Sequence, residues 1–298
     1  MKIAISGATG FLGAHLATTL RKQGSDVLAL VRHAPGGGEI GWDPDAGTIE
    51  REKLEGVDTV IHLAGENIAT RWTAEAKRRI LESRVRGTGL LASTLAGLAR
   101  KPRLLISVSA VGIYGDRGDE TLSERSPPGA GFLAEVAQAW EAAAQPARDA
   151  GIRVVHPRFG MILAADGGAL AKMLPPFRLG LGGRLGSGKQ WMSWVALDDV
   201  LSAMLHIIGN QGLQGAVNLV APEPVRNSEF TRVLAHELHR PALFTVPSVA
   251  LYLRFGREMV DEVLIGSARV IPERLPAAGF SFRFPALGPA LAHILNPA

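Results

Sequence analysis

The stretch Lys2-Ile3-Ala4-Ile5-Ser6-Gly7-Ala8-Thr9-Gly10-Phe11-Leu12-Gly13 opens the chain and decides its fold. Its apolar start predicts a buried strand, and the apolar segment after Gly10 predicts a helix. Gly7 permits the tight turn between them, Gly10 lets the backbone approach a phosphate, and Gly13 lets the helix pack closely on the strand. Main-chain amides at such a helix N-terminus bind a pyrophosphate. A glycine-rich turn without ligand is the alternative. The expected dinucleotide-binding residues of this turn are Gly7, Thr9, Gly10, Phe11, Leu12 and Gly13.

Short apolar runs alternate with longer amphipathic segments through the first two-thirds of the chain. The expected strands are Lys2–Ser6, Asp26–Val31, Thr59–Leu63, Leu104–Ser109 and Arg153–His156. The expected helices are Leu12–Gln23, Ala74–Ala99 and Leu133–Ala150. This alternation is typical of a parallel sheet covered by helices on both faces. The sequence therefore predicts an α/β protein with a doubly wound parallel sheet of the Rossmann type.

The pattern changes after about Phe159. A stretch rich in glycine and proline, Pro175 to Gly188, predicts a loop excursion. Val195–Ile208 then predicts a helix and Ala216–Val220 a strand, and the tail from Asn227 predicts two or three helices together with the segment Ile271–Phe284. We expect a dinucleotide-binding domain of residues 1–160 and 194–222. Residues 161–193 and 223–298 would form a smaller, discontinuous C-terminal capping lobe.

Composition excludes several classes of site. The 298 residues include no cysteine, so disulfides, thiolate metal sites and cysteine nucleophiles are excluded. His236 and His239 lie three apart, whereas the zinc-binding helix motif needs four, and no metal site is expected. The net charge of +4 comes from basic residues spread along the chain, so no nucleic-acid partner is expected. No apolar stretch approaches the roughly 20 residues of a membrane span, so we expect no membrane partner and a cytoplasmic location.

The end of the second strand indicates which dinucleotide binds. An acidic residue there would bind the ribose 2′-hydroxyl and repel a 2′-phosphate. In this chain Val31 is followed by Arg32, and no carboxylate precedes Glu39. A guanidinium forms charge-assisted hydrogen bonds with phosphate. We therefore expect NADP(H), with Arg32 on the 2′-phosphate; a solvated loop arginine is the alternative.

Further motifs resemble the extended short-chain dehydrogenase/reductase superfamily. Val60–Gly65 is similar to its motif beside the cofactor, and Ile106–Ser109 followed by Gly112–Gly115 is similar to its serine motif. More closely, the chain resembles the atypical branch of epimerase family proteins, although Ala196 stands where that branch usually has histidine. The landmarks of the branch span nearly the whole chain: Leu63–Ile68, Arg71–Thr73, Phe132–Glu135, Trp140-Glu141, Gly186–Gly188, Trp194, Pro272, Arg274-Leu275 and Gly279-Phe280. The resemblance implies a Rossmann fold and cofactor contacts from Leu63, Ala64, Gly65 and Glu66.

The chain departs from the superfamily at its catalytic positions. The usual proton donor is the tyrosine of Tyr-x-x-x-Lys, but Phe132-Leu133 stands at that place and Val136-Ala137 at that of lysine. Apolar side chains cannot transfer a proton. Of the usual catalytic residues, the resemblance implies only the serine, at or near Ser109. Arg84 replaces an asparagine and would hold cofactor phosphate near the nicotinamide ribose, or is a plain helix-surface arginine.

Another acid would have to supply the proton. Glu135, one helical turn from the vacated position, is the candidate, assisted by Glu66 or Tyr114; alternatively Glu135 faces solvent and stabilises its helix. Arg158 would reach the cofactor or an anionic substrate, or form a structural ion pair. We expect an NADP(H)-dependent oxidoreductase or epimerase, monomeric or homodimeric, acting on an unidentified small molecule. A non-catalytic NADPH sensor or partner-binding module is the alternative.

Overall fold

A parallel sheet forms the centre of the molecule, for which a computed structural model describes residues 1–296. Strand β1 (Lys2–Ser6) lies between β2 and β5, so the glycine turn that follows it emerges at the middle of the sheet. In spatial order the parallel strands are β14 (Gly215–Leu219), β9 (Arg153–Phe159), β6 (Leu104–Ser107), β5 (Thr59–His62), β1, β2 (Asp26–Val31) and β3 (Glu39–Asp43). The short β4 (Thr48–Ile49) is antiparallel to β3, and β7 (Ser109–Ala110) pairs with β9. The predicted doubly wound α/β fold is confirmed.

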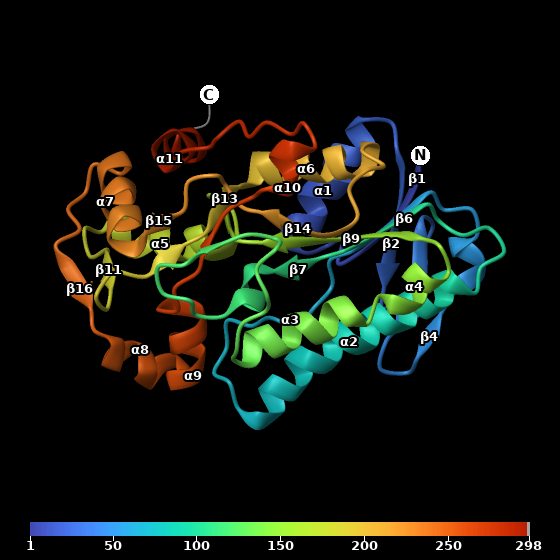
Figure 1. The fold of residues 1–298 in the computed structure, drawn as a ribbon, viewed down its shortest axis with the longest axis horizontal. Coiled ribbons are helices and arrows are strands. Elements are labelled where there is room, and N and C mark those ends of the chain that lie inside the picture. Colours follow the sequence, from blue (N-terminus) through green and yellow to red (C-terminus); the bar gives the residue numbers. More distant parts are fainter. Residues whose placement is uncertain (297–298) are drawn as a thin grey trace.

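Helices cover both faces of this sheet (Figure 1). One face carries α1 (Phe11–Lys22), α6 (Leu197–Gly209) and α10 (Arg274–Ala277), and the other carries α2 (Ala74–Ala96), α3 (Phe132–Ala142) and α4 (Gln145–Asp149). Successive side chains of β1 point to opposite faces of the sheet, which explains why there are two cores. Ile3 and Ile5 belong to the core under α1 and α6, whereas Ala4 belongs to the core under α2 and α4.

Two expected elements are each divided in the structure, and one strand was not expected. The helix predicted over Leu133–Ala150 is two helices, because Pro146 cannot donate an amide hydrogen bond and instead lies in the first turn of α4. The strand predicted over Leu104–Ser109 is divided at Val108 into β6 and β7. Strand β3 was missed, since only two of its five residues, Ile40 and Trp42, are buried and the apolar signal is short.

The C-terminal part adds a third core, which includes Trp194, Phe230 and Leu291. The stretch predicted as a loop excursion begins inside helix α5 (Gly168–Arg178), and this prediction was wrong. Leu170, Leu174 and Phe177 are buried at helical spacing, and their burial stabilises α5 although Pro175 and Pro176 lie in its last turn. The other strands here are β10 (Met161–Leu163), β11 (Gly183–Leu185), β12 (Trp191–Met192), β13 (Trp194–Ala196), β15 (Val225–Arg226) and β16 (Phe244–Val246).

The tail holds more helices than the predicted two or three. Within residues 1–296 they are α7 (Asn227–Glu237), α8 (Ser248–Phe255), α9 (Arg257–Met259), a π-helical turn (Val260–Leu264), α10 and α11 (Leu287–Leu295). Such short helices are stabilised by tertiary packing rather than by local helix propensity, so the sequence pattern does not reveal them. The tail also returns to the sheet domain: β17 (Arg269–Val270) pairs with β8 (Thr121–Leu122), and Phe280 joins the core beneath α1 and α6. Single 3₁₀ turns occupy Arg51–Leu54 and Val111–Tyr114.

Candidate functional site

The turn between β1 and α1 leaves no room for a side chain at Gly7 or Gly13. Gly7 has φ +72°, and a Cβ there would lie 3.0 Å from the Ala64 amide nitrogen. A Cβ on Gly13 would lie 2.0 Å from the Gly7 carbonyl oxygen, far inside van der Waals contact. The Gly10 amide donates to the same oxygen at 3.0 Å. The three glycines therefore serve the tight turn and the close helix packing that a dinucleotide-binding turn requires.

The N-terminus of α1 is chemically suited to an anion. Its first turn contains no acidic residue, and Gly10 at the N-cap offers no side-chain hydrogen bond. Helix α2 differs, since Thr73 caps it by accepting from the Ala76 amide. The first amides of a helix have no partner within the helix. Those of Phe11, Leu12 and Gly13 are therefore the donors that would hold a pyrophosphate, so the residues present fit a dinucleotide.

Arg32 lies where the sequence places it, directly after β2. Its side chain is exposed and makes no ion pair with any residue of 1–296. It lines a cavity of about 460 Å³ together with His33 and Trp42. Asp43, Glu50 and Glu52 also line this cavity. The Glu50 carboxylate accepts from the Gly41 amide at 2.6 Å and pairs with Lys53. The Arg32 guanidinium is therefore free to receive an anionic group at this end of the sheet.

The segment after β5, residues 63–65, faces the glycine turn on one side and Arg84 on the other. The Leu63 amide donates to the Ser6 hydroxyl at 3.2 Å, and a Cβ on Gly65 would lie 3.3 Å from Arg84 Cζ. The Arg84 guanidinium lies over the Trp140 ring at 4.9 Å. Burial lowers the pKa of Arg84 to about 10, which the charge of Glu66 partly offsets. Arg84 is thus a half-buried cation against the backbone of Gly65, and its Nη1 donates to the Ile80 carbonyl of its own helix at 3.0 Å.

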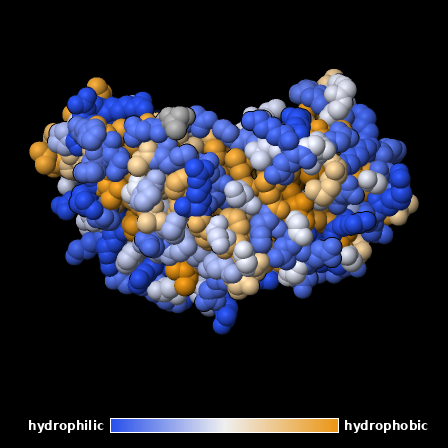
Figure 2. All heavy atoms as spheres, turned by 90° about the horizontal axis from the view of Figure 1, so that it is seen from above, coloured by the Kyte–Doolittle hydropathy of each residue, from blue (hydrophilic) through white to orange (hydrophobic). Residues whose placement is uncertain are grey.

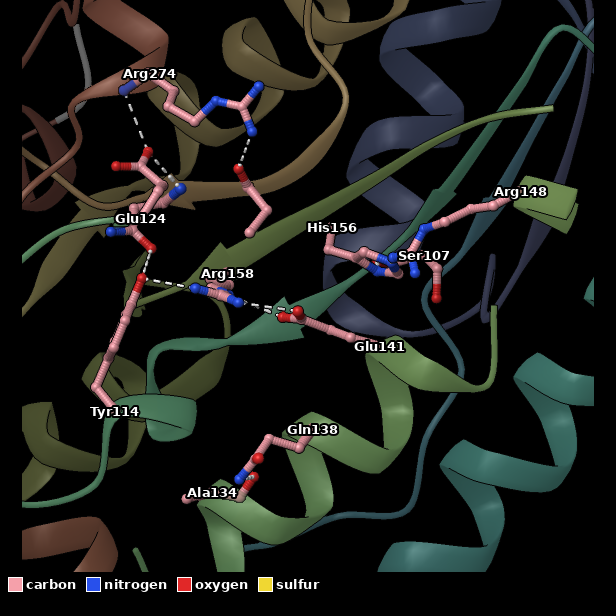
Figure 3. A network of polar contacts seen from close by, with 12 residues as sticks. Ser107, Tyr114, Glu124, Ala134, Gln138, Glu141, Arg148, His156, Arg158 and Arg274 are labelled. Carbon is pink, nitrogen blue, oxygen red and sulfur yellow. Dashed lines mark hydrogen bonds and ion pairs between the residues drawn. The ribbon is translucent and has the colours of Figure 1, made fainter. Parts of the chain in front are cut away.

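Arg158 occupies the centre of a buried polar network (Figure 3). Its Nε and Nη2 donate to the two Glu141 oxygens at 2.8 and 2.9 Å, and its Nη1 donates to the Tyr114 hydroxyl at 2.9 Å. Burial alone would lower the pKa of Arg158, but the hydrogen bonds and charge of Glu141 raise it above its usual value. The structural ion pair, one of the two alternatives expected for Arg158, is present.

Tyr114 is committed to the same network. Its hydroxyl donates to Asn218 Oδ1 at 2.8 Å, and the side chain is fully buried. Burial raises the pKa of Tyr114, although the Arg158 charge opposes this. A phenol with both its donor and its acceptor engaged, and with a raised pKa, is a poor proton donor for a ligand.

The other expected catalytic residues are dispersed. Ser109 is buried on β7, beside the Glu141 carboxylate. Glu135 is exposed in the first turn of α3, and this geometry agrees with the alternative in which it faces solvent. Leu133 packs against Gly112, where a Cβ would lie 3.2 Å from that of Leu133. Glu135 is therefore exposed to solvent, whereas Ser109 is buried.

Four polar side chains form a row across neighbouring strands of the sheet, beneath α2 and α3. Ser6, His62, Ser107 and His156 lie at or near the carboxyl ends of adjacent strands, all essentially without exposure. The Ser6 hydroxyl accepts from the amides of Leu63 and Ala64 at 3.2 and 3.4 Å, which occupies both its lone pairs, so it donates its proton to His62 Nδ1 at 2.6 Å. His156 Nδ1 donates to the Ser107 carbonyl at 2.8 Å, and its Nε2 accepts from Arg148. Both imidazoles are therefore held neutral.

These two histidines predict loss of stability in mild acid. Burial lowers the pKa of both His62 and His156 to about 4, aided by the Arg84 charge at His62. The unfolded chain binds these protons below about pH 6.5, so stability is complete above that pH and is lost as the pH falls toward 4. We expect the free energy of unfolding in urea to be roughly 4 kcal/mol lower at pH 5 than at pH 7.5. His156→Gln should flatten this slope, whereas an equal flattening by exposed His33→Gln would contradict the assignment.

Sequence reasoning missed the contact that caps α3. The Glu262 carboxylate accepts from the amides of Phe132 and Leu133 at 2.9 and 2.8 Å, next to Gly131, which has no side chain to serve as a cap. The two sides of this contact lie about 130 residues apart, and no local signal joins them.

Within residues 1–296 no group of three potential ligands is arranged to hold a metal. No helix in the same range is both long and apolar enough for a membrane crossing.

Comparison with known proteins agrees with this geometry. Residues 3–220 match the NAD dependent epimerase/dehydratase family, and residues 246–294 match a domain of unknown function, DUF1731. The epimerase family protein Mb2239 of Mycobacterium bovis is 41% identical over 98% of this chain and 96% of its own length. The epimerase family protein YfhF of Bacillus subtilis is 35% identical over 99% of this chain and 98% of its own.

A solved structure shows the same fold with a dinucleotide. The crystal structure of human epimerase family protein SDR39U1 (isoform 2) with NADPH is 35% identical to this chain and has a TM-score of 0.91, with 99% of each chain covered. The match includes the β1–α1 turn and the tail. With the family match over residues 3–220, these findings show that the chain belongs to the NAD dependent epimerase/dehydratase family, as a NAD(P)-binding protein of the extended short-chain dehydrogenase/reductase type.

Proposed function

We propose that this protein binds NADP(H) in preference to NAD(H) and acts as an oxidoreductase or epimerase on a small molecule. One observation carries the proposal: the chain has two anion-binding groups, the free first-turn amides of α1 and the Arg32 guanidinium after β2, which forms no ion pair within residues 1–296. The first would hold the pyrophosphate and the second the 2′-phosphate. The related human protein in complex with NADPH supports this preference.

Other residues would orient the nicotinamide half of the cofactor. Leu63, Ala64 and Gly65 present backbone beside the glycine turn, where the close approach at Gly7 leaves room only for main chain. Arg84 has no carboxylate within ion-pair distance in residues 1–296, and a half-buried cation without a counterion favours an anionic ligand. We assign it to cofactor phosphate. The bound cofactor would supply or accept hydride, and the chain would position it.

Replacing Arg32 by glutamine tests the dinucleotide preference. The variant removes a charged partner of the 2′-phosphate, so we expect NADPH affinity to fall by about 10- to 100-fold while NADH affinity stays unchanged. Calorimetric titration of both nucleotides measures this. Exposed Arg103→Gln, at the opposite end of the sheet, is the matched control. Equal losses for both nucleotides, or equal affinities in the parent protein, would refute the proposed role.

A second candidate function is an NADPH-binding sensor or partner-binding module without turnover. The observation in its favour is that the Tyr114 hydroxyl is engaged by Arg158 and Asn218. The resemblance also implies that apolar Phe132-Leu133 stands where the family has its catalytic tyrosine. In this reading no side chain delivers a proton to the substrate, and the bound cofactor itself is the signal. The two candidate functions share the cofactor site and differ only in whether a reaction of a substrate follows cofactor binding.

Reduction of a broad panel of carbonyl compounds with NADPH separates the two candidates. Turnover would support the enzyme, and tight NADPH binding with no turnover across the panel would support the sensor. If turnover occurs, Glu135→Gln tests the proton donor expected from the sequence. Because Glu135 is exposed, we expect activity to change by less than about twofold, as for the first-turn control Glu75→Gln. A loss of 100-fold or more would instead make Glu135 the acid.

A further inference from the structure

One end of the molecule carries an unusual concentration of exposed apolar side chains. Within residues 1–296, every strongly exposed large apolar side chain other than Met1 lies on two segments of the C-terminal part. These side chains are Leu179, Leu181, Leu243, Phe244, Val249 and Leu253, which we call the apolar tip. Single exposed leucines are ordinary, but a gathered set marks an interaction surface.

The structure brings the two segments of the apolar tip together. Strand β11 pairs with β16 in parallel, with Gly183 opposite Phe244. A Cβ on Gly180 would lie 3.6 Å from the Pro241 ring, and Arg240 Nε donates to the Arg178 carbonyl at 2.9 Å. Leu179 and Leu181 therefore lie beside Leu243 and Phe244. In Figure 1 these elements and α8 occupy the left end of the molecule, and Figure 2 shows orange apolar atoms among blue ones at the same end.

Helix α8 adds the other two side chains. None of its eight residues is buried, although a helix that packs on a domain normally buries one face. Val249 and Leu253 lie four residues apart and therefore share a face, with 65% and 76% of their surfaces exposed. Helix α8 thus presents an apolar face that no residue of the described chain covers.

The two segments that form the apolar tip carry charge of one sign. Residues 167–197 and 238–257 contain no aspartate or glutamate, while the first range holds four lysines or arginines and the second three. The nearest acidic residues after this range are already paired, Glu258 with Lys77 and Asp261 with Arg257. Within these two ranges, the exposed cations that make no ion pair with any described residue are Lys172, Arg178, Arg184, Lys189, Arg240 and Arg254.

From these observations we infer that the apolar tip binds the surface of an anionic lipid membrane. Leucine, phenylalanine and valine side chains would enter the interface between headgroups and acyl chains, while the arginines contact lipid phosphates. The sequence-based expectation of no membrane partner rested on the lack of a stretch long enough to cross a bilayer. An element that lies in the interface needs no such stretch. The inference is independent of the proposed NADP(H) function.

Vesicle co-sedimentation tests this inference. The full chain is mixed with vesicles of phosphatidylcholine and phosphatidylglycerol in equal parts, or of phosphatidylcholine alone. We expect binding to the mixed vesicles only, and a decrease as salt is added, because salt screens charges at the surface. No binding to mixed vesicles at low ionic strength, or equal binding to both kinds, would overturn the inference.

Two double variants separate charge from apolar contact. Arg178→Gln with Arg254→Gln, and Leu243→Ser with Leu253→Ser, are each expected to lower the bound-to-free ratio roughly tenfold or more. Lys101→Gln with Arg103→Gln removes the same charge at the far end of the sheet and should change the ratio less than twofold. Circular dichroism melting confirms that each variant is folded, since all six side chains are exposed.

Other occupants of the apolar tip give different results. A concentration-dependent dimer in size-exclusion chromatography, lost in the serine variant, together with no vesicle binding, would assign the surface to a second copy. A complex with an acidic protein and no vesicle binding would likewise overturn the membrane assignment. An equal loss of vesicle binding in the Lys101/Arg103 control would show only a general effect of net charge and would also overturn it.

Discussion

Gly13→Ala is expected to weaken NADPH binding by about 100-fold while the chain remains folded. The new Cβ would meet the Gly7 carbonyl oxygen at 2.0 Å and Ala8 Cα at 2.9 Å, so the turn or the helix has to move. Displacing the first amides of α1 by about an ångström removes their alignment with the pyrophosphate. An error of this size at a binding or catalytic site costs on the order of 100-fold. Calorimetric titration with NADPH measures the loss.

Gly89→Ala provides the matched control for this substitution. Gly89 also lies within a helix, α2, but a Cβ there meets no atom within 4 Å. We expect unchanged NADPH affinity and slightly higher stability, since alanine favours the helix by about 1 kcal/mol over glycine. NADPH binding by the Gly13 variant at the affinity of the parent chain would show that this turn does not hold the cofactor.

The Arg158–Glu141 pair predicts the second large effect, on stability. Glu141→Gln leaves a buried guanidinium without its counterion, and Arg158→Met leaves a buried carboxylate. Breaking a buried pair on one side costs about 3–5 kcal/mol. Burial alone would raise the pKa of Glu141, but the hydrogen bonds and charge of Arg158 hold it below its usual value. Urea unfolding at pH 7 measures the expected loss in each single variant.

The double variant Arg158→Met with Glu141→Leu distinguishes a buried ion pair from simple packing. Replacing both charges with apolar groups removes the cost of desolvating them, so we expect most of the lost stability to return. Tyr114 keeps its hydrogen bond to Asn218 in this variant. Additive losses in the double variant would mean that the two charged side chains contribute independently.

Local patterns in the sequence predicted the sheet domain well. The bounds of β1 and β2 were predicted to the residue, because each strand is an apolar run ended by a turn. The prediction failed where tertiary contacts override local signals. Helix α5 continues through Pro175 because Leu174 and Phe177 are buried, and burial cannot be known before the C-terminal core is assembled. The division into two domains stays a prediction.

The candidate site was predictable in its backbone and not in its side chains. The glycine turn follows from spacing alone, since only glycine tolerates those contacts. The partners of Arg158 could not be predicted, because Glu141 and Tyr114 reach it from separate elements. The roles of Arg32, Arg84 and Ser109 stay predictions, which cofactor titrations would test.

The carboxylate of Glu262 on the N-terminus of α3 has a consequence for how the protein unfolds. Residues beyond 245 also supply the strand beside β8, the Arg274 hydrogen bonds to the Gln214 and Ala216 carbonyls, and Phe280 beneath α1. A chain shortened to residues 1–245 would expose these surfaces all at once. We therefore expect the regions matched by the two family descriptions to unfold together in a single cooperative transition.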